Sequence, residues 1–229
     1  MHSALLAKVP LFADLCPSEI ESLSRAVRSR RYRKGSLVHA AGAMGADLYL
    51  IQSGRVAIQL PSDHGNELTL RLLGPGDFFG EVSLVDEEPW YADAIAFDEC
   101  VLLLLAGRDF LNLLDTHPAI TRRLLAITCK RLRHNAHFAQ DLAFLDVPTR
   151  LARALVRLAE GTGWGWEGDS QGSCRIEITQ SGLAAHVGAT RESINKWLGY
   201  YQRRGYINCE RDTIIVLRLD ELRMRAETE

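Results

Sequence analysis

The strongest structural signal in the sequence lies in residues 178–216. Gly188 suits the tight turn that ends a short helix, and Thr190 is a residue type that caps the start of the next helix. After this turn, apolar side chains recur at three- and four-residue intervals, which predicts a helix with one buried face: Ile194, Trp197, Leu198 and Tyr201. Ala184 is small where two such helices must cross closely. The pattern predicts a pair of short, closely packed helices.

The residues after the second predicted helix have the pattern of a β-hairpin. Arg203, Arg204 and Gly205 form a basic, glycine-ended helix stop. Two strand-like runs follow, residues 206–209 and 213–217, with three polar residues between them. Two helices followed by a hairpin form a winged helix-turn-helix, which predicts a DNA-binding domain. The alternative is an ordinary helical hairpin with a solvated polar face.

The predicted second helix exposes four polar residues near its start: Arg191, Glu192, Asn195 and Lys196. In a helix-turn-helix, the first turn of this helix enters the major groove of DNA. There an arginine can donate to O6 and N7 of guanine, and a glutamate can accept from N4 of cytosine. These side chains are therefore the predicted base-reading surface.

Three motifs occur along the chain in a fixed order: GPGDFFGEVSL, DLAFLDVPTRLARALVRLA and RESINKWL. Together they resemble the cyclic-AMP receptor protein and FNR (Crp/Fnr) family of bacterial transcription regulators. The resemblance implies an α+β fold with an N-terminal β-roll similar to a cyclic-nucleotide-binding jelly roll, a long dimerisation helix and a C-terminal winged helix-turn-helix. We expect a sensory roll at residues 1–116, the helix and a hinge at 117–146, and the DNA-binding domain at 147–229.

Residues 31–105 contain short apolar runs separated by glycines, a pattern typical of a closed β-sheet with sharp corners. A short amphipathic helix is predicted before them, at residues 17–27. A basic run from Arg25 to Lys34 is predicted to be a solvated face, with contact to flanking DNA as the alternative. The predicted strands are residues 37–39, 47–53, 54–60, 67–73, 92–96 and 100–106.

One long helix is predicted from His117 to about Leu145, with Pro118 in its first turn. Apolar residues recur along this helix and form a seam. If the helix packed only on its own roll, half of the seam would stay exposed, so the pattern predicts a homodimer. The resemblance implies the same pairing, with two recognition helices about 34 Å apart on DNA. Arg131 and His134 interrupt the seam and are candidate positions for control by effector or pH. The seam follows a heptad-like spacing: Ile120, Leu124, Ile127, Arg131, His134, Phe138, Asp141 and Leu145.

The chain departs from the family at its phosphate-binding cassette. By resemblance, Trp90 and Tyr91 stand at the positions that hold arginine and serine. In members that bind a cyclic nucleotide, that arginine neutralises the phosphate. Asn135 and Ala136 likewise stand where cyclic-AMP binders have threonine and serine. The cassette residues that keep the pattern, and complete the predicted effector pocket, are Gly80, Glu81, Val82 and Ser83.

These departures predict that the protein does not respond to cyclic AMP in the way usual for the family. Burying the phosphate without its charged partner would cost binding free energy. Gly80 and Glu81 are then expected only to shape the turn. Three alternatives stay open: Trp90 and Tyr91 fill the pocket, the pocket takes another molecule such as cyclic di-GMP or an aromatic compound, or an effector binds elsewhere. Both rings can also be ordinary core. We predict no resident cofactor.

By the same resemblance, Arg191, Glu192 and Lys196 fall on positions that read a TGTGA-like half-site in an inverted repeat. Lys196 is a departure, because the family commonly has arginine there and lysine lacks the planar fork that grips guanine. The residues predicted to contact phosphates, through hydroxyls and helix N-termini, are Thr179, Gln180, Thr190 and Ser193.

Charge supports DNA binding by the second half of the chain. The net charge is −2, but residues 116–229 carry 17 Lys and Arg against 13 Asp and Glu, whereas the first 115 residues carry 10 against 16. Phosphate attraction is local, so an acidic total does not exclude DNA binding. There is no run of about eighteen apolar residues and no signal-peptide pattern, so we expect a cytoplasmic protein without membrane contact.

No catalytic or metal site is predicted. The five cysteines lie far apart without a CxxC pair, which predicts reduced thiols and no iron-sulfur cluster. The acidic run Asp86, Glu87 and Glu88 lies in a predicted turn without a Ser–His or Cys–His pair. We therefore expect a regulator and not an enzyme, with double-stranded DNA, a second copy and RNA polymerase as partners. The alternative is a ligand-binding roll that acts through protein partners without specific DNA binding.

The expected mechanism is allosteric. An event in the roll shifts the long helix, and the hinge near residues 146–148 reorients the DNA-binding domain.

Overall fold

The computed structural model describes residues 2–61, 67–160 and 174–227. The chain divides into two compact units. The first unit consists of Met1–Leu60 and Leu72–Arg133, and the second consists of Pro61–Arg71 and His134–Glu229.

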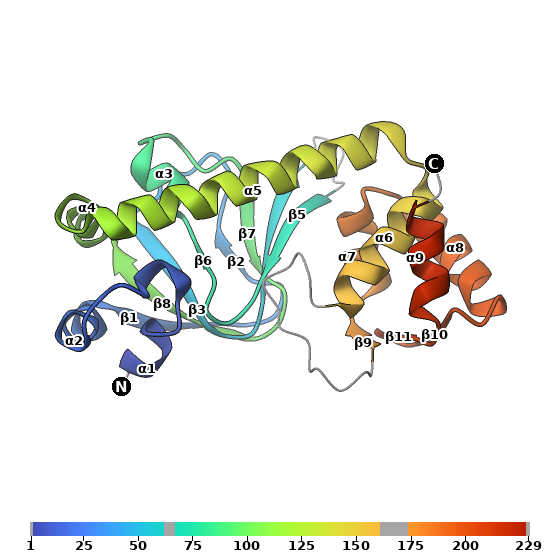
Figure 1. Ribbon diagram of the computed structural model, residues 1–229, viewed down its shortest axis with the longest axis horizontal. Helices are drawn as coiled ribbons and strands as arrows, with labels where there is room; N and C mark the ends of the chain where they lie inside the picture. The colour runs from blue at the N-terminus through green and yellow to red at the C-terminus, as the bar shows by residue number, and fades with distance from the viewer. Residues whose placement is uncertain (1, 62–66, 161–173, 228–229) are drawn as a thin grey trace. The chain divides into compact units, whose positions relative to one another are not determined.

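The first unit is built on a β-roll of two four-stranded sheets, although Pro61–Arg71, with most of one strand, is counted with the second unit (Figure 1). The central strand of one sheet is the apolar run Cys100–Ala106, in which Leu102, Leu103 and Leu105 are fully buried. The predicted roll is therefore confirmed. Its first sheet has the order β1 (Arg28–Tyr32), β8 (Cys100–Ala106), β3 (Asp47–Ser53) and β6 (Phe78–Phe79), and its second has the order β2 (Leu37–His39), β7 (Asp93–Ala96), β4 (Val56–Pro61) and β5 (Glu67–Leu73).

Strand β1 was not expected. It pairs antiparallel with β8, so part of the basic run is a strand of the roll. The basic side chains from Arg25 to Lys34 are exposed, as both a solvated face and a contact with flanking DNA require. Arg28 forms an exposed ion pair with Asp47 at 3.1 Å.

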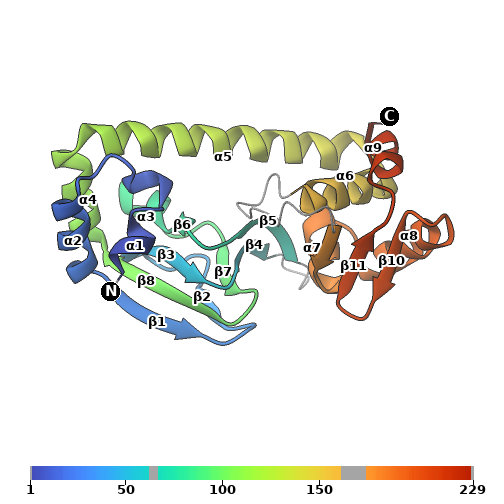
Figure 2. The same cartoon turned by 60° about the horizontal axis from the view of Figure 1, so that its bottom comes forward.

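Short helices close one end of the roll (Figure 2). Their apolar residues, including Leu6, Phe12 and Phe110, join a buried core with Leu48 and Leu50 of β3. Only the helix near residue 17 was predicted among them. These elements are α1 (Ser3–Leu6), η1 (Pro10–Phe12), α2 (Pro17–Ala26), α3 (Glu81–Val85) and α4 (Gly107–Thr116).

The long helix α5 (Pro118–Phe144) is confirmed, but the predicted seam is wrong. Ile120 and Leu124 are 1% and 7% exposed in the core of the roll, and Ile127 packs against the same core. The three- and four-residue spacing arises because this face packs within the chain. The large apolar side chains that α5 leaves exposed are Leu125, Leu132 and Phe144.

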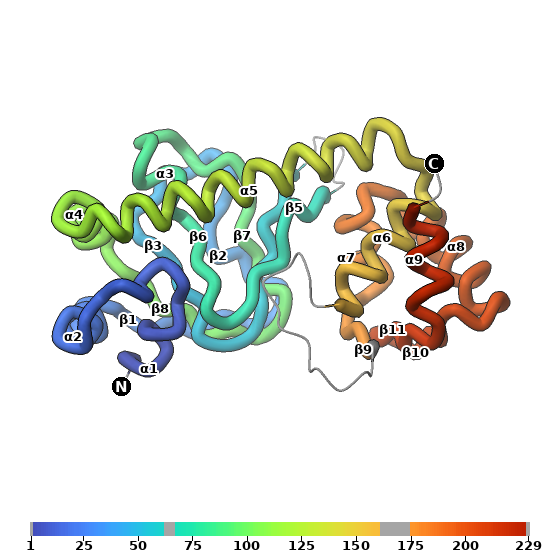
Figure 3. Tube along the Cα trace, in the orientation of Figure 1, coloured from blue at the N-terminus to red at the C-terminus, as the bar shows by residue number. Residues whose placement is uncertain are grey.

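The second unit combines helices with a three-stranded sheet of order β10-β11-β9, and Figure 3 traces its path. The predicted hairpin is confirmed as β10 (Ile207–Glu210) and β11 (Thr213–Val216). Two of its elements were not predicted, β9 (Cys174–Glu177) and α9 (Leu219–Glu227). The remaining helices are α6 (Val147–Ala159), α7 (Gln180–Val187) and α8 (Arg191–Arg203).

No helix in the described residues is long and apolar enough to cross a membrane. Within the same ranges, no group of three or more His, Cys, Asp or Glu side chains is arranged to hold a metal ion. Cys16, Cys100, Cys129 and Cys209 are free thiols, as predicted for these four.

Candidate functional sites

Helices α7 and α8 form the predicted helix-turn-helix, and hydroxyls cap both of their starts. Thr179 Oγ1 accepts a hydrogen bond of 3.0 Å from the backbone N–H of Gly182. Thr190 Oγ1 accepts one of 3.2 Å from Ser193, which confirms the predicted cap. Each cap satisfies a donor that the first helical turn cannot pair internally. The starts of both helices are therefore fixed by their own sequence.

Gly188 forms the turn between these helices for two reasons. Its φ of +67° lies in the left-handed region, where glycine has no steric penalty. A Cβ at this position would lie 2.6 Å from Leu142 Cδ2 and 3.2 Å from Leu68 Cδ1. Both leucines belong to the second unit, so the turn is packed within that unit.

Arg150 holds the same turn, a role that the sequence analysis missed. Its Nε donates to the carbonyl of Val187 at 3.0 Å, and its Nη2 donates to that of Gly188 at 3.1 Å. Its Nη1 donates to the carbonyl of Leu145, just after α5, at 2.8 Å. Burial lowers the pKa of Arg150, and Asp146 and Asp141 oppose that shift. One guanidinium thus connects the end of α5 to the helix-turn-helix turn.

The predicted base-reading side chains share one exposed face of α8. Arg191, Glu192, Asn195 and Lys196 are exposed, while Ile194, Leu198 and Tyr201 are at most 3% exposed in the core. Trp197, expected in the buried stripe, is half-buried and packs edge-on to Tyr200 with 5.6 Å between ring centroids. Tyr201 donates from its hydroxyl to the carbonyl of Pro148 at 2.8 Å, which ties α8 to α6.

The predicted phosphate contacts lie at the starts of the two helices. Thr190 is exposed, whereas Thr179, Gln180 and Ser193 are half-buried. Because the threonine oxygens act as acceptors in the caps, their hydroxyl protons remain suited to donate to an anion. Unpaired N–H groups of a first helical turn favour the same ligand.

The expected effector pocket holds the indole of Trp90, which is 8% exposed. Gly80 has φ +92° and precedes α3. A Cβ on Gly80 would lie 3.0 Å from Trp90 Cζ2 and 3.3 Å from Tyr49 Cδ2. The indole therefore lies in contact with the glycine of the cassette.

Aromatic rings enclose Trp90 on several sides. Its centroid lies 4.0 Å from that of His39, and it makes edge contacts with Tyr49 and Phe79 at 5.8 and 5.9 Å. Backbone hydrogen bonds link it to the 40s loop: its N–H donates to Ala43 O and its carbonyl accepts from Gly42 N. Tyr91, by contrast, is 47% exposed, so the interpretation that both rings are core is wrong.

Glu81 does more than shape a turn, which corrects the sequence-based expectation. Glu81 is 3% exposed, and its carboxylate accepts from Arg131 Nη1 at 2.5 Å. Arg131 also donates from Nη2 to Phe78 O at 2.8 Å, and its guanidinium lies 4.5 Å from the centroid of the Phe78 ring. Pairing compensates much of the cost of burying the carboxylate. Arg131 thus belongs to the roll's own core contacts and not to an intersubunit seam.

Three polar atoms near this pocket are buried without a hydrogen-bond partner among the described residues: Trp90 Nε1, Ser83 Oγ and His39 Nε2. A Cβ on Gly45 would collide with Ser83 Oγ and lie 2.5 Å from Trp90 Nε1. The other predicted pocket residues are Val82, which is half-buried on α3, and Asn135, which lies on the α5 portion of the second unit with a buried Oδ1.

His186 on α7 is a buried titratable side chain of the second unit. Its ring is buried, stacks on Phe138 with 6.4 Å between centroids and hydrogen-bonds to the backbone of Thr69. Burial, with Arg157 and His134 nearby, lowers the pKa of His186 to about 3. In the unfolded chain a histidine protonates near pH 6.5.

The unfolded state therefore binds more protons than the folded state between these two pKa values, and stability falls as pH falls. We expect the free energy of unfolding, measured with urea, to drop by about 1 kcal/mol between pH 6.5 and 5.5 from this group. His186→Gln should remove that part of the pH dependence. An identical drop in the variant would contradict the assignment.

Comparison with known proteins agrees with this division of sites. Residues 29–117 match the model of the cyclic nucleotide-binding domain, and residues 149–225 match that of the Crp-like helix-turn-helix domain. The chain is 35% identical to the CRP-like cAMP-activated global transcriptional regulator of Mycobacterium tuberculosis, over 97% of this chain and 98% of that protein. It is 33% identical to the cyclic AMP receptor protein of Thermus thermophilus, over 90% and 92%.

Solved structures give the same fold. The c-di-GMP responsive global regulator CLP of Xanthomonas campestris aligns with a TM-score of 0.75 at 26% identity, over 88% of this chain and 99% of that one. A transcriptional regulator of the CRP/FNR family from Thermus thermophilus aligns with a TM-score of 0.72 at 28% identity, also over 88% and 99%.

Proposed function

The chain belongs to the Crp/Fnr family of transcription regulators, and from this we propose that it is a sequence-specific DNA-binding regulator whose nucleotide pocket is filled by Trp90. The observation that carries the DNA-binding proposal is the exposed face of α8, with Arg191 and Glu192 in its capped first turn. We propose further that the protein is not an enzyme, that it lies in the cytoplasm and that it contacts RNA polymerase.

The proposed target is an inverted repeat of TGTGA-like half-sites. Arg191 grips a guanine and Glu192 accepts from a cytosine, because these exposed side chains have the donors and acceptors that those bases require. Lys196 supplies a single ammonium group, so its guanine contact is looser than that of an arginine. The proposed phosphate contacts come from Thr179, Gln180, Thr190 and Ser193 at the two helix starts.

Homodimerisation is proposed through a different face of α5 from the predicted seam. Leu125 and Leu132 are 63% and 67% exposed, one heptad apart. Small uncharged residues continue the exposed stripe toward the end of the helix, which allows two helices to approach closely. The stripe consists of Leu125, Thr128, Leu132, Ala136, Ala139 and Ala143.

Leu132→Glu should therefore convert the protein to a monomer, because two carboxylates would face each other in the paired stripe. Sedimentation velocity at micromolar protein measures the change. Arg133→Glu, at the neighbouring exposed position outside the stripe, should stay dimeric. Dimers of Leu132→Glu would place the interface on another face.

We propose that cyclic AMP is not the usual effector. The indole of Trp90 lies against Gly80, and Trp90 stands where the cassette arginine is expected. Arg131, which lies beside the cassette, already pairs with Glu81. The relative in Mycobacterium tuberculosis is described as cAMP-activated, and CLP as c-di-GMP responsive. We propose that this chain either needs no nucleotide in its roll or responds to another small molecule, such as cyclic di-GMP, at a different place.

The test is binding to a fluorescent TGTGA-N6-TCACA palindrome and to a scrambled duplex, with and without cyclic AMP, cyclic GMP and cyclic di-GMP. We expect specific binding without cyclic AMP, and a steep loss of affinity as salt rises. Equal affinity for both duplexes would refute sequence-specific reading. Binding that appears only after cyclic AMP is added would refute the role of Trp90.

A further inference from the structure

A cavity of about 690 Å³ in the second unit lies apart from the surfaces discussed so far. This volume falls in the range of small-molecule sites in proteins, about 300 to 1,000 Å³. The lining side chains come from the last turns of α5 and from α6, and they include His137, Gln140, Asp141, Phe144, Arg153 and Arg157.

Asp141 and two arginines form the polar wall. The Asp141 carboxylate is buried and accepts from Arg153 Nη1 at 2.6 Å, while Arg157 Nη2 lies 3.4 Å from its other oxygen. Arg153 Nε also donates to Ala226 O at 2.7 Å, which fixes that guanidinium. One carboxylate between two guanidinium groups leaves a net positive charge. Arg157, held by one long bond, keeps most of its donors for an anionic ligand.

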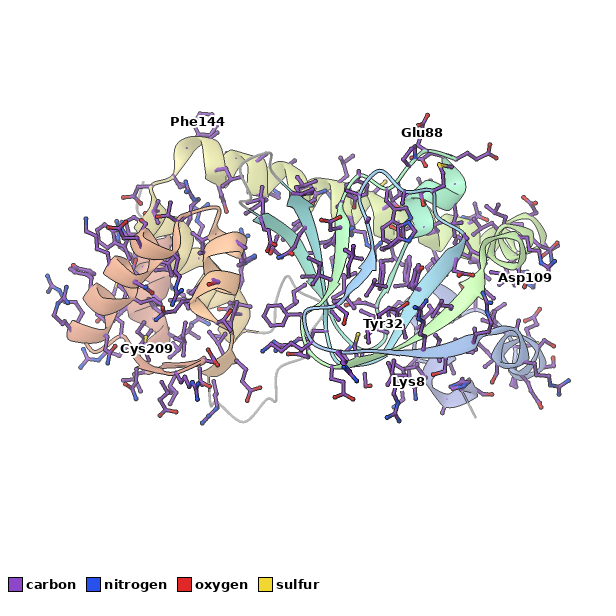
Figure 4. All side chains as sticks on the ribbon, turned by 180° about the vertical axis from the view of Figure 1, so that it is seen from behind. Lys8, Tyr32, Glu88, Asp109, Phe144 and Cys209 are labelled. Atoms are coloured by element: carbon purple, nitrogen blue, oxygen red, sulfur yellow. The ribbon has the colours of Figure 1, made fainter. Side chains whose placement is uncertain are left out.

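An apolar ring stands beside these charges. Phe144 is 80% exposed at the end of α5, and Figure 4 shows it pointing outward there. An exposed aromatic face stacks on planar rings, and guanidinium forks bind phosphates bidentately. Gln140 adds an amide that can both donate and accept.

We propose that this cavity binds a nucleotide, with its phosphate on Arg153 and Arg157 and its base stacked on Phe144. The site differs from the roll pocket that Trp90 fills. It supplies a place for an effector outside the nucleotide-binding domain matched by the first half of the chain.

Its position also gives the ligand a route to the DNA-reading surface. Leu145 lines the cavity, and its carbonyl accepts from Arg150, which donates in turn to Val187 and Gly188. A ligand that moves Leu145 therefore acts on the turn that precedes α8. This regulatory step rests on the proposed function, whereas binding itself does not.

The test is calorimetric titration of the intact protein with cyclic di-GMP, GTP and cyclic AMP, each alone. We expect at least one of them to bind, and Arg157→Gln to weaken that binding by about tenfold or more, since a charge-assisted contact is lost. Phe144→Ala should weaken it as well. Arg122→Gln makes the same charge change at an exposed position early in α5 and should leave binding unchanged.

Failure of all three nucleotides to bind would overturn the inference. An equal effect of Arg157→Gln and Arg122→Gln would do the same. Loss of binding in Trp90→Ala protein that urea denaturation shows to be still folded would also overturn it, because the nucleotide would then occupy the roll. Wild-type protein that binds a nucleotide here but does not distinguish the palindrome from scrambled DNA would refute only the proposed function. Specific DNA binding without any nucleotide binding would refute only this site.

Discussion

Replacing Arg191 with alanine should weaken binding to the palindrome by about 1 to 3 kcal/mol and remove the preference for guanine at one step of each half-site. Arg191 is the first residue of α8, exposed, beside a turn fixed by the Thr190 cap and by the Gly188 packing. Its guanidinium can therefore meet a base edge without reorganising the helix.

Competition binding with single-base variants of each half-site measures both effects. In wild-type protein, changing the contacted guanine should cost about as much as the Arg191→Ala substitution, and in the variant it should cost little. Arg122→Ala removes an exposed arginine from α5 and serves as the control. Equal losses on the palindrome and on scrambled DNA would mean that Arg191 contacts only phosphate.

The helix-turn-helix could be predicted because its determinants are local. The Thr190 cap and the left-handed Gly188 involve only residues a few positions away, so both can be recognised from the sequence. The strands of the roll were predictable for a similar reason, since turn glycines separate their apolar runs. Strand β1 was not predicted, because its exposed residues are mostly arginines and only its pairing with β8 makes it a strand.

Periodicity alone could not identify the packing partner of α5. The spacing of Ile120, Leu124 and Ile127 correctly predicts one buried face, but it carries no information on whether the chain's own roll or a second copy buries it. The exposed stripe through Leu125 and Leu132 has the same spacing and only two large apolar residues. Burial in the folded chain separates the two faces.

Side chains that act over long sequence distances were also missed. Arg131 pairs with Glu81, 50 residues earlier, and Arg150 donates to carbonyls of residues 187 and 188. Neither contact has a local pattern, because one partner is distant and the other is backbone. The replacement of the cassette arginine by Trp90 was visible in the sequence, but the contact of its ring with Gly80 required the fold.

Trp90→Ala should have the largest effect on stability, a loss of about 3 to 5 kcal/mol in the free energy of unfolding. The indole is 92% buried among His39, Tyr49 and Phe79, and its removal leaves a cavity that these rings fill only in part. Urea denaturation of wild type and variant measures the loss. Tyr91→Ala, next in sequence but 47% exposed, should cost less than about 1 kcal/mol.

Free indole distinguishes a ring that fills a preformed pocket from a ring that merely adds core volume. An enclosed cavity that matches an aromatic ring in size can bind that ring as a free ligand. Millimolar indole should therefore restore part of the stability of Trp90→Ala and leave wild type unchanged. Restoration would show that the roll keeps its pocket when the tethered ring is absent. A full loss without restoration would mean that the walls collapse, so that Trp90 builds the pocket region instead of occupying it.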